Sequence, residues 1–316
     1  MGWRWFGLCI ALAVPMVATA QDATPADAGC DAAYEALPHG TLLDLLDPDA
    51  PAERRAQALG AYERLAGMEG CPEFGYTLGQ LYRHGPYLPG NLLPQDLPKA
   101  RRLIRAMAED GYLPAYADLA EMEMRHANAR EAMKWTQAYL YFTREVRQAF
   151  IDDADDLQYQ RSAYNGNLLA RVEIISKWAR PPLPSKVKRE DLKDYLAVHG
   201  APVAKRMLER ERGTHARASA QDAALIGLAN VPEPCYVKLE KVGAASAAWI
   251  VEVLPSGGMG RVVLENFVPN PEVTEELKAC LLERRFETFE GDRSKTMRFH
   301  MVAGSTEGAS LRRRRR

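Results

Sequence analysis

The sequence has few of the features by which catalytic and metal-binding proteins are recognised. Its 316 residues include only 6 histidines and 5 cysteines, and no two cysteines have the C-x-x-C spacing of zinc or thiol-redox sites. The H-E-x-x-H, G-x-S-x-G and phosphate-binding G-x-x-x-x-G-K-[ST] patterns are all missing. We therefore expect a protein that is not an enzyme, with no catalytic residues, no cofactor and no metal.

The chain also has no excess of charge of either sign. Its 41 Lys and Arg residues nearly balance 42 Asp and Glu residues, for a net charge of −1. A balance of this kind does not indicate nucleic acid as a partner. The exception is the C-terminus, where residues 312–316 are all arginine; we expect residues 305–316 to form a disordered tail.

After the first residues, no apolar run is long enough to cross a bilayer. Residues 6–17 are apolar, follow the cationic Arg4 and precede the small residues 18–20. This pattern predicts a signal peptide over residues 1–20, cleaved before Gln21 and too short for the ~20 residues of a spanning helix. We expect a periplasmic or secreted protein with no transmembrane segment after cleavage, beginning with a flexible leader over residues 21–29.

Export changes the interpretation of the cysteines, because disulfides form in oxidising compartments. Four cysteines remain after cleavage, and these allow three pairings. They form an N-terminal pair and a C-terminal pair, and one cysteine of the first pair follows the other by one repeat length. We therefore expect the bridges Cys30–Cys71 and Cys235–Cys280.

A helical repeat with a period of 41 residues occupies the first half of the chain. Gly111 follows Gly70 by this offset, and each glycine precedes a segment with apolar residues at helical spacing. A period of this size indicates stacked helical hairpins. The structural positions of the repeat are Gly70, Leu78, Gly79, Tyr82, Ala100, Gly111 and Leu119.

These residues resemble the Sel-one-like repeat, a subclass of the tetratricopeptide-type helical hairpins. The resemblance is strongest over residues 70–111, weaker over the next unit, and marginal around Gly29. It implies paired helices whose close approach depends on small residues such as Gly79 and Ala100. We expect this helical repeat domain to span residues 30–178, with helices over about 52–68, 72–83, 96–110, 114–125 and 129–150.

A proline-rich break interrupts the helical pattern after this region. Residues 180–184 contain three prolines, and no helix is expected to cross them. Residues 190–200 and 202–211 predict two shorter charged helices, separated before Pro202. The polar, alanine-rich residues 212–224 are the expected linker, so residues 179–231 form a connecting segment.

The pattern changes to period two after Pro234. Residues 248–254 and 261–265 predict two strands joined by a glycine-rich hairpin turn. Residues 271–284 predict a helix, and residues 296–302 a closing strand. We expect a small α+β domain with an antiparallel sheet over residues 232–304. The fold class is thus α plus α+β: an α-solenoid of helical hairpins followed by this domain.

The order of these elements resembles the C-terminal domain of the TonB energy-transducer superfamily. The resemblance rests on the strand with its turn over residues 253–261, the helix after Pro271, the Arg285-Phe286 dipeptide that closes the helix, and the strand that ends with residues 297–299. The chain lacks the uncleaved anchor and the long proline-rich spanner of the transducers. The resemblance therefore implies a periplasmic recognition domain whose exposed strand edge pairs with a partner.

Two residues in the loop over residues 84–95 are the candidate partner-binding residues. Tyr87 lies between Pro86 and Leu88 and is expected to be exposed, and aromatic residues are enriched at binding hot spots. His84 begins the same loop, where it either contacts a partner or is simply solvated.

Three functions are consistent with the sequence. The favoured function is a non-enzymatic adaptor or scaffold of the Gram-negative cell envelope, which binds protein partners on a short helical repeat surface. The second is an accessory factor in TonB-type outer-membrane transport or envelope assembly, acting through the C-terminal domain. A cell-wall hydrolase with an unrecognised site is the third.

Overall fold

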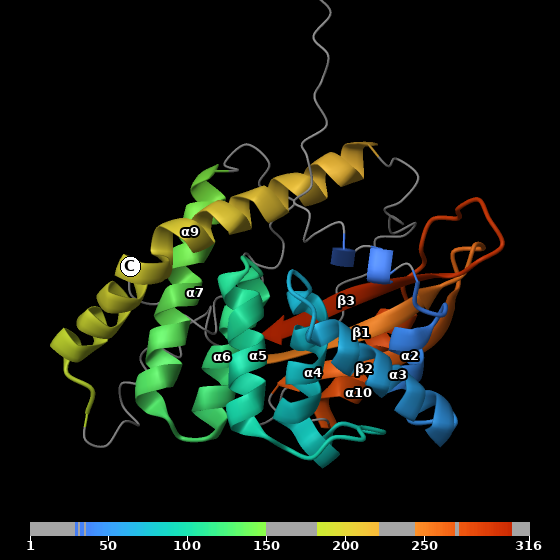
Figure 1. Ribbon diagram of the computed structural model, residues 1–316, viewed down its shortest axis with the longest axis horizontal. Coiled ribbons are helices and arrows are strands. Elements are labelled where there is room, and N and C mark those ends of the chain that lie inside the picture. Colours follow the sequence, from blue (N-terminus) through green and yellow to red (C-terminus); the bar gives the residue numbers. More distant parts are fainter. Residues whose placement is uncertain are drawn as a thin grey trace, which may run out of the picture.

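The computed structural model describes residues 29–30, 32–34, 36–149, 182–220, 244–268 and 272–304. Within them the chain is mostly helical, with a small antiparallel sheet near the C-terminus (Figure 1). None of the helices in these ranges is both long enough and apolar enough to cross a membrane.

The helices of the first half pack in chain order. They are α2 (Thr41–Leu46), α3 (Ala52–Ala66), α4 (Pro72–His84), the short 3-10 helix η1 (Gly85–Tyr87), α5 (Leu97–Glu109), α6 (Leu113–Arg125) and α7 (Ala129–Ala149). Each α-helix from α2 to α6 contacts the α-helix that follows it. Helices α4 to α7 therefore stand side by side, as Figure 1 shows in colours from cyan to green.

The glycines of the repeat adopt the same backbone conformation. Gly70 has φ 82° and Gly111 has φ 93°, both in the left-handed region that glycine enters without steric cost. Each lies two residues before the start of the next helix, α4 or α6. The repeated glycine thus reverses the chain between a helix and its successor.

Close packing between α4 and α5 depends on Gly79. A Cβ atom at this position would lie 2.9 Å from Cγ1 of Ile104 and 3.2 Å from Cβ of Leu103. Ala100, one helical turn before Ile104 on α5, is completely buried. The small residues predicted from the repeat therefore lie where the two helices touch, and Asp96 caps α5 by accepting from the Lys99 amide at 2.9 Å.

The connecting segment differs from the prediction of two short helices and a linker. Residues Ser185–Ala220 form one helix, α9, which passes through Pro202 without ending and takes in most of the expected linker. A proline within a helix removes one backbone hydrogen bond and strains the preceding turn. Packing of α9 along α7 compensates for this cost, and Val203 and Met207 beyond the proline are buried.

Helix α9 also explains a second property of Gly111. A Cβ atom there would lie 2.7 Å from the Met207 nitrogen and 2.8 Å from the Arg206 carbonyl carbon. The Arg206 side chain donates to the backbone oxygen of Glu109 at 2.7 Å. The second repeat glycine thus permits α9 to cross the α5–α6 turn at backbone contact.

The C-terminal part contains β1 (Ala244–Val253), β2 (Met259–Val268), α10 (Glu272–Leu282) and β3 (Lys295–Gly304). The sheet order is β2-β1-β3 and both pairings are antiparallel, which confirms the predicted antiparallel sheet. Residues 236–239, which follow Pro234 and alternate with period two in the sequence, lie outside the described residues.

The sheet has a separate apolar contact on each face. Trp249 and Val251 pack with α10, including its residue Leu281. Ile250 and Val263 belong instead to the main core, which the helices form. The sheet therefore lies between α10 on one side and α2 with α4 on the other, and the two halves of the chain share a core.

The predicted disulfide of the N-terminal half is present. The sulfur atoms of Cys30 and Cys71 lie 2.32 Å apart, with Cα atoms separated by 5.5 Å. Cys280 is buried in α10, whereas Cys235, its predicted partner, lies outside the described residues.

Candidate functional site

A β-bulge in β2 turns two polar side chains toward the helices. Ala248 pairs with Asn266 and Trp249 with Leu264, so Glu265 is an extra residue on β2. Bulges redirect side chains and are frequent beside functional sites. Glu265 bonds to Thr77 and Asn266 to His84, both residues of α4.

Asn266 joins a buried cluster around Asp118 of α6. Its amide donates to Asp118 Oδ1 at 2.9 Å, and the Arg83 guanidinium donates to the same oxygen at 3.0 Å. Tyr76 and Gln80 donate to Oδ2 at 2.7 and 2.8 Å. Both carboxylate oxygens are thus fully occupied, so this cluster links α4, α6 and β2 rather than receiving a substrate.

His84 belongs to the same buried interface, and its prediction as a loop residue open to a partner is wrong. It is the last residue of α4, has 0% exposure, and its Nε2 lies 2.8 Å from Oδ1 of Asn266. Burial, with Arg83 nearby, holds the pKa of His84 well below its usual value. The sequence placed His84 at the start of a turn-rich loop, but in the structure its ring stacks on Phe267 of β2.

Glu265 forms the second link between sheet and helices. It is 1% exposed, accepts from Thr77 of α4 at 3.2 Å, and pairs with Arg298 of β3 at 2.5 Å. Burial lowers the pKa of Arg298, but the Glu265 carboxylate outweighs this and raises it well above its usual value. Arg298 therefore stays charged, with Glu265 compensating it.

A third link lies at the other end of the sheet. Asp44 of α2 accepts from Arg261 of β2 at 2.7 Å and from Arg54 of α3 at 2.6 Å. Burial raises the pKa of Asp44, but the two guanidinium groups outweigh it and leave the pKa lowered. Together the three links hold β2 and β3 at a fixed position beside the first helices.

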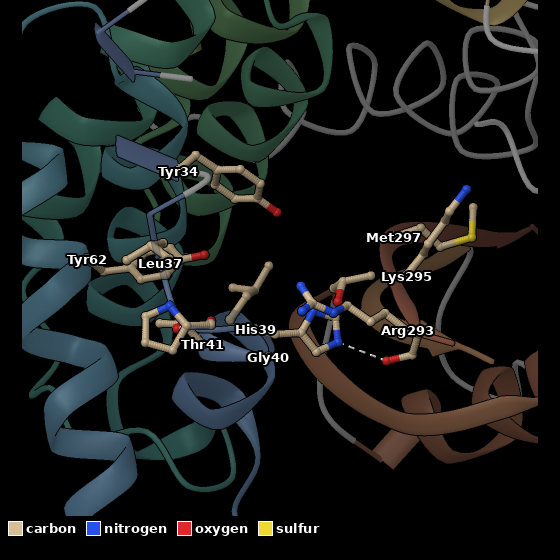
Figure 2. A pocket seen from close by; sticks show the side chains of 13 residues that line it. Tyr34, Leu37, His39, Gly40, Thr41, Tyr62, Arg293, Lys295 and Met297 are labelled. Atoms are coloured by element: carbon tan, nitrogen blue, oxygen red, sulfur yellow. Dashed lines mark hydrogen bonds between the residues drawn. The ribbon is translucent and has the colours of Figure 1, made fainter. Parts of the chain in front are cut away.

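Between these links the surface is hollowed into a groove of about 610 Å³. Figure 2 shows Tyr34, Leu37 and Tyr62 on the helical side, facing Arg293, Lys295 and Met297 on the sheet side. The remaining lining residues are Pro38, His39, Gly40, Thr41, Leu42, Ser294 and Thr296. A smaller hollow of about 170 Å³ continues the groove inward, toward Phe74, Ile250 and Arg298.

One wall of the groove is the edge of β3. Residues 293–297 all line the larger hollow, and residues 296–298 line the smaller one. Successive side chains of a strand point to opposite faces, so a run of consecutive lining residues means that the strand presents its edge. Strand β3 pairs only with β1 among the described strands, so its other edge is the one that faces the groove.

The opposite wall is aromatic. The Tyr62 and Phe74 rings meet edge to face with centroids 5.1 Å apart, and the Tyr34 ring lies 6.1 Å from that of Phe74. Tyr34 is 52% exposed, whereas Tyr62 is nearly buried. The Cys30–Cys71 disulfide, close in sequence to Tyr34 and to Phe74, fastens this wall to the start of α4.

A serine and a histidine that line the groove lie near a carboxylate, Glu252, that does not line it. Nε2 of His39 lies 3.0 Å from Oγ of Ser294, the dashed contact in Figure 2, and the Ser294 hydroxyl donates to Glu252 at 2.7 Å. In acyl-transfer triads the serine donates to the histidine, and the carboxylate binds the other ring nitrogen. Here the carboxylate takes the serine hydrogen bond, so the order differs from that of a triad.

The pKa of Glu252 is a second difference from a catalytic triad. Burial raises its pKa, but hydrogen bonds from the Arg261 amide and Ser294 outweigh this, and the pKa is lowered. A carboxylate with a lowered pKa is a weak base. The contacts of Ser294 therefore fasten the groove wall near His39 to the β1–β2 hairpin.

Cys30, Cys71 and Glu73 form the single group in the described part of the chain with ligand atoms close enough for a metal ion. The two sulfur atoms lie at disulfide distance. Cysteine binds metals as the thiolate, and a disulfide sulfur has no such charge. This group therefore fits a covalent bridge and not a metal site.

The other predicted binding residue, Tyr87, is exposed as expected. It lies in η1, is 57% exposed, and has the Arg125 guanidinium 5.6 Å from the centre of its ring. Tyr87 does not line the groove, and His84 is buried, so the two predicted residues do not form one exposed binding surface. The repeat positions Leu78, Tyr82 and Leu119 are buried core residues.

No protein family, curated protein or solved structure matches this chain. The site is therefore interpreted from its own geometry. Sequence reasoning missed the groove because its walls are more than 200 residues apart in the chain. The one local signal was the Glu265-Asn266 pair, which interrupts an apolar strand and marks the bulge.

Proposed function

We propose that this protein is a non-enzymatic adaptor or scaffold of the cell envelope that binds a segment of a protein partner in the groove. The observation that carries the proposal is the edge of β3 that pairs with none of the described strands and faces an aromatic wall across a hollow of about 610 Å³. Extended segments bind such edges through main-chain hydrogen bonds, and side-chain pockets add specificity.

The proposal places the binding surface at the junction of the two halves. Tyr34 and Leu37 belong to the N-terminal, helical half, whereas Met297 belongs to the C-terminal sheet. Because the halves share a core and three polar links, the site depends on both. Experiments on binding therefore need the full chain, with point variants in place of fragments.

The proposed location in the cell envelope rests on the predicted signal peptide. The helical part is proposed to contain a Sel-one-like repeat unit. The 41-residue separation of Cys30 and Cys71 supports the repeat, because the bridge joins equivalent positions of successive units. A disulfide also suits an oxidising compartment such as the periplasm.

A second candidate function is favoured by the element order of the sheet. Among the described residues, a hairpin, a helix and a strand follow one another in the order of the TonB-like domain that the sequence resembles. In this case the protein is an accessory factor in outer-membrane transport or envelope assembly. The partner bound in the groove would then be an outer-membrane transporter or an assembly protein.

Photo-crosslinking in cells tests the adaptor function. A photoreactive amino acid replaces Tyr34 in the groove, Tyr87 in η1 or Val198 on α9, the last being 68% exposed and distant from the groove. We expect a discrete crosslinked protein from position 34 and none from position 198. Crosslinks from position 87 alone would move the binding surface to the repeat loop.

The identity of the crosslinked protein, determined by mass spectrometry, separates the two candidates. An outer-membrane transporter supports the second, and another envelope protein supports the first. The hydrolase alternative is tested separately with purified protein and peptidoglycan. Turnover that is abolished by Ser294→Ala would overturn both binding functions.

A further inference from the structure

The groove differs in charge from the rest of the chain. Over the whole sequence, acidic and basic residues are nearly equal, with 42 and 41 of each. Among the described residues that line the larger hollow, Arg293 and Lys295 are basic and none is acidic. The nearest acidic lining residue, Glu73, belongs to the smaller inner hollow.

The two cations lie on the sheet side of the groove, as Figure 2 shows. Arg293 is exposed and forms no ion pair with the described residues. The Lys295 ammonium lies 4.7 Å from the centre of the Phe289 ring, which holds it at the start of β3. Arg298, deeper in the groove, is already compensated by Glu265 and contributes little net charge.

The apolar residues of the groove lie both opposite these cations and beside them. Tyr34 and Leu37 form the opposite wall, whereas Met297 lies next to Lys295 on β3. A segment lying along β3 would thus meet the two cations and, close to them, apolar surface. This arrangement matches a segment that carries acidic residues beside apolar residues.

We infer that the groove selects an acidic, extended segment of a protein partner, whose Asp or Glu side chains lie against Arg293 and Lys295. This inference rests on the proposed function, because it requires the groove to be the binding site. Ion pairs of exposed side chains are weak individually, and their effect on partner choice comes from repulsion of the wrong charge as well as attraction.

The test uses a displayed library of random twelve-residue peptides, selected on the full-length protein with its disulfides intact. We expect the enriched peptides to carry Asp or Glu beside apolar residues and to lose affinity as salt is raised. A synthetic peptide from the enriched set is then measured against the double variant Arg293→Glu/Lys295→Glu. Affinity should fall roughly tenfold or more, since two ion pairs become repulsive.

A matched control changes the net charge by the same amount away from the groove. Lys186 and Lys205 of α9 are 80% and 76% exposed, so Lys186→Glu/Lys205→Glu supplies it. Affinity for the peptide should stay within about twofold of the unmodified protein, as expected for weak surface electrostatics. The same peptide with its acids changed to Lys should bind the groove variant better than the unmodified protein.

The outcomes separate the inference from the function on which it rests. Enriched peptides without acidic residues, or equal binding by the Arg293→Glu/Lys295→Glu variant, would overturn the charge preference while leaving groove binding in place. Peptides whose binding is unaffected by Tyr34→Ala, or no enrichment at all, would overturn both. Circular dichroism melting of each variant ensures that the loss of affinity is not a loss of folding.

Discussion

The imidazole of His84 is stacked on the phenyl ring of Phe267, with ring centroids 4.1 Å apart and planes inclined by 24°. One ring ends helix α4, and the other belongs to β2 near the C-terminus of the chain. The contact joins parts of the sequence that are 183 positions apart in numbering and that local patterns assign to different domains. It also makes the stability of the protein sensitive to pH.

His84 should cause a loss of stability in mild acid. Its folded-state pKa is well below the usual 6.5, so below about pH 6.5 the unfolded chain binds a proton that the folded chain excludes. The free energy of unfolding should therefore be highest above pH 6.5. It should decrease by about 1.4 kcal/mol per pH unit below it.

Urea unfolding at several pH values measures this effect. His84→Gln should flatten the pH dependence between about pH 5 and 6.5. The control variant is His126→Gln. The pKa of His126 is also lowered, by partial burial and by Arg125, but its side chain is exposed, unlike that of His84. A profile that is unchanged in His84→Gln would contradict the prediction.

Removal of the Asp118 carboxylate should be strongly destabilising. Asp118→Ala leaves Arg83 as a buried charge without its counter-ion and removes an acceptor from Tyr76, Gln80 and Asn266. Removing one partner of a buried ion pair lowers the free energy of unfolding by about 3–5 kcal/mol. Glu209→Ala, at an exposed i,i+4 pair on α9, should cost no more than about 0.5 kcal/mol in the same denaturation experiment.

A second consequence of this cluster concerns cooperativity. Because the Asp118 cluster joins α4, α6 and β2, loss of structure in the sheet and in the helices should coincide in the unmodified protein. Tryptophan fluorescence, which includes Trp249 in the sheet and Trp135 in α7, and far-ultraviolet circular dichroism should give one transition midpoint. Two separated midpoints would show that sheet and helices unfold independently.

Replacing Ala127 by glycine should stabilise the protein. Ala127 follows α6 with φ 58°, the one non-glycine residue with positive φ in the described ranges. The Asn128 amide donates to the Glu123 oxygen at 2.9 Å, as in a Schellman motif that favours glycine at this position. The left-handed conformation costs alanine about 1–2 kcal/mol, partly offset by the greater chain entropy of glycine.

The net gain from Ala127→Gly should be up to about 1 kcal/mol, read as a higher thermal midpoint. The side chain is exposed, so no packing is lost. Gly111→Ala is the converse change, with φ 93° and backbone atoms of α9 only 2.7 Å from the added methyl. It should lower the midpoint, and an increase would be inconsistent with this description of the turn.

The Cys30–Cys71 bridge should contribute both to stability and to the groove. Replacing both cysteines by alanine should lower the free energy of unfolding by about 2–4 kcal/mol. The wall containing Tyr34 should then lose its attachment to α4. The affinity for a groove peptide should therefore decrease even well below the melting temperature, where the variant is folded and its lower stability does not reduce binding. Retained affinity would mean that the Tyr34–Phe74 and Tyr62–Phe74 contacts hold the wall by themselves.

Local patterns were sufficient for most of the elements. The apolar spacing predicted α3, α4, α6 and α7, and the 41-residue register placed Gly70 and Gly111 at equivalent turns. Period two and the glycine-rich turn predicted the β1–β2 hairpin. These features depend on neighbours within a few residues, so the sequence contains all the information that they require.

The sequence did not reveal how α9, His84 and the sheet pack. Pro202 normally ends a helix, but contacts with α7 keep α9 continuous. His84 resembles a solvated loop residue, yet it is buried because β2 covers the end of α4. In each case a distant segment changes the environment on which the local rule depends.

The sequence by itself determined the helices other than α9, the hairpin and the first disulfide, because side-chain periodicity, turn residues and the repeat length can be read directly from the chain. Only the tertiary structure decided the groove. Tyr34 and Met297 line it together because the bulge at Glu265 and the links to Asp118 and Asp44 bring the last strand beside the first helices. That juxtaposition depends on a shared core, which no single stretch of sequence specifies.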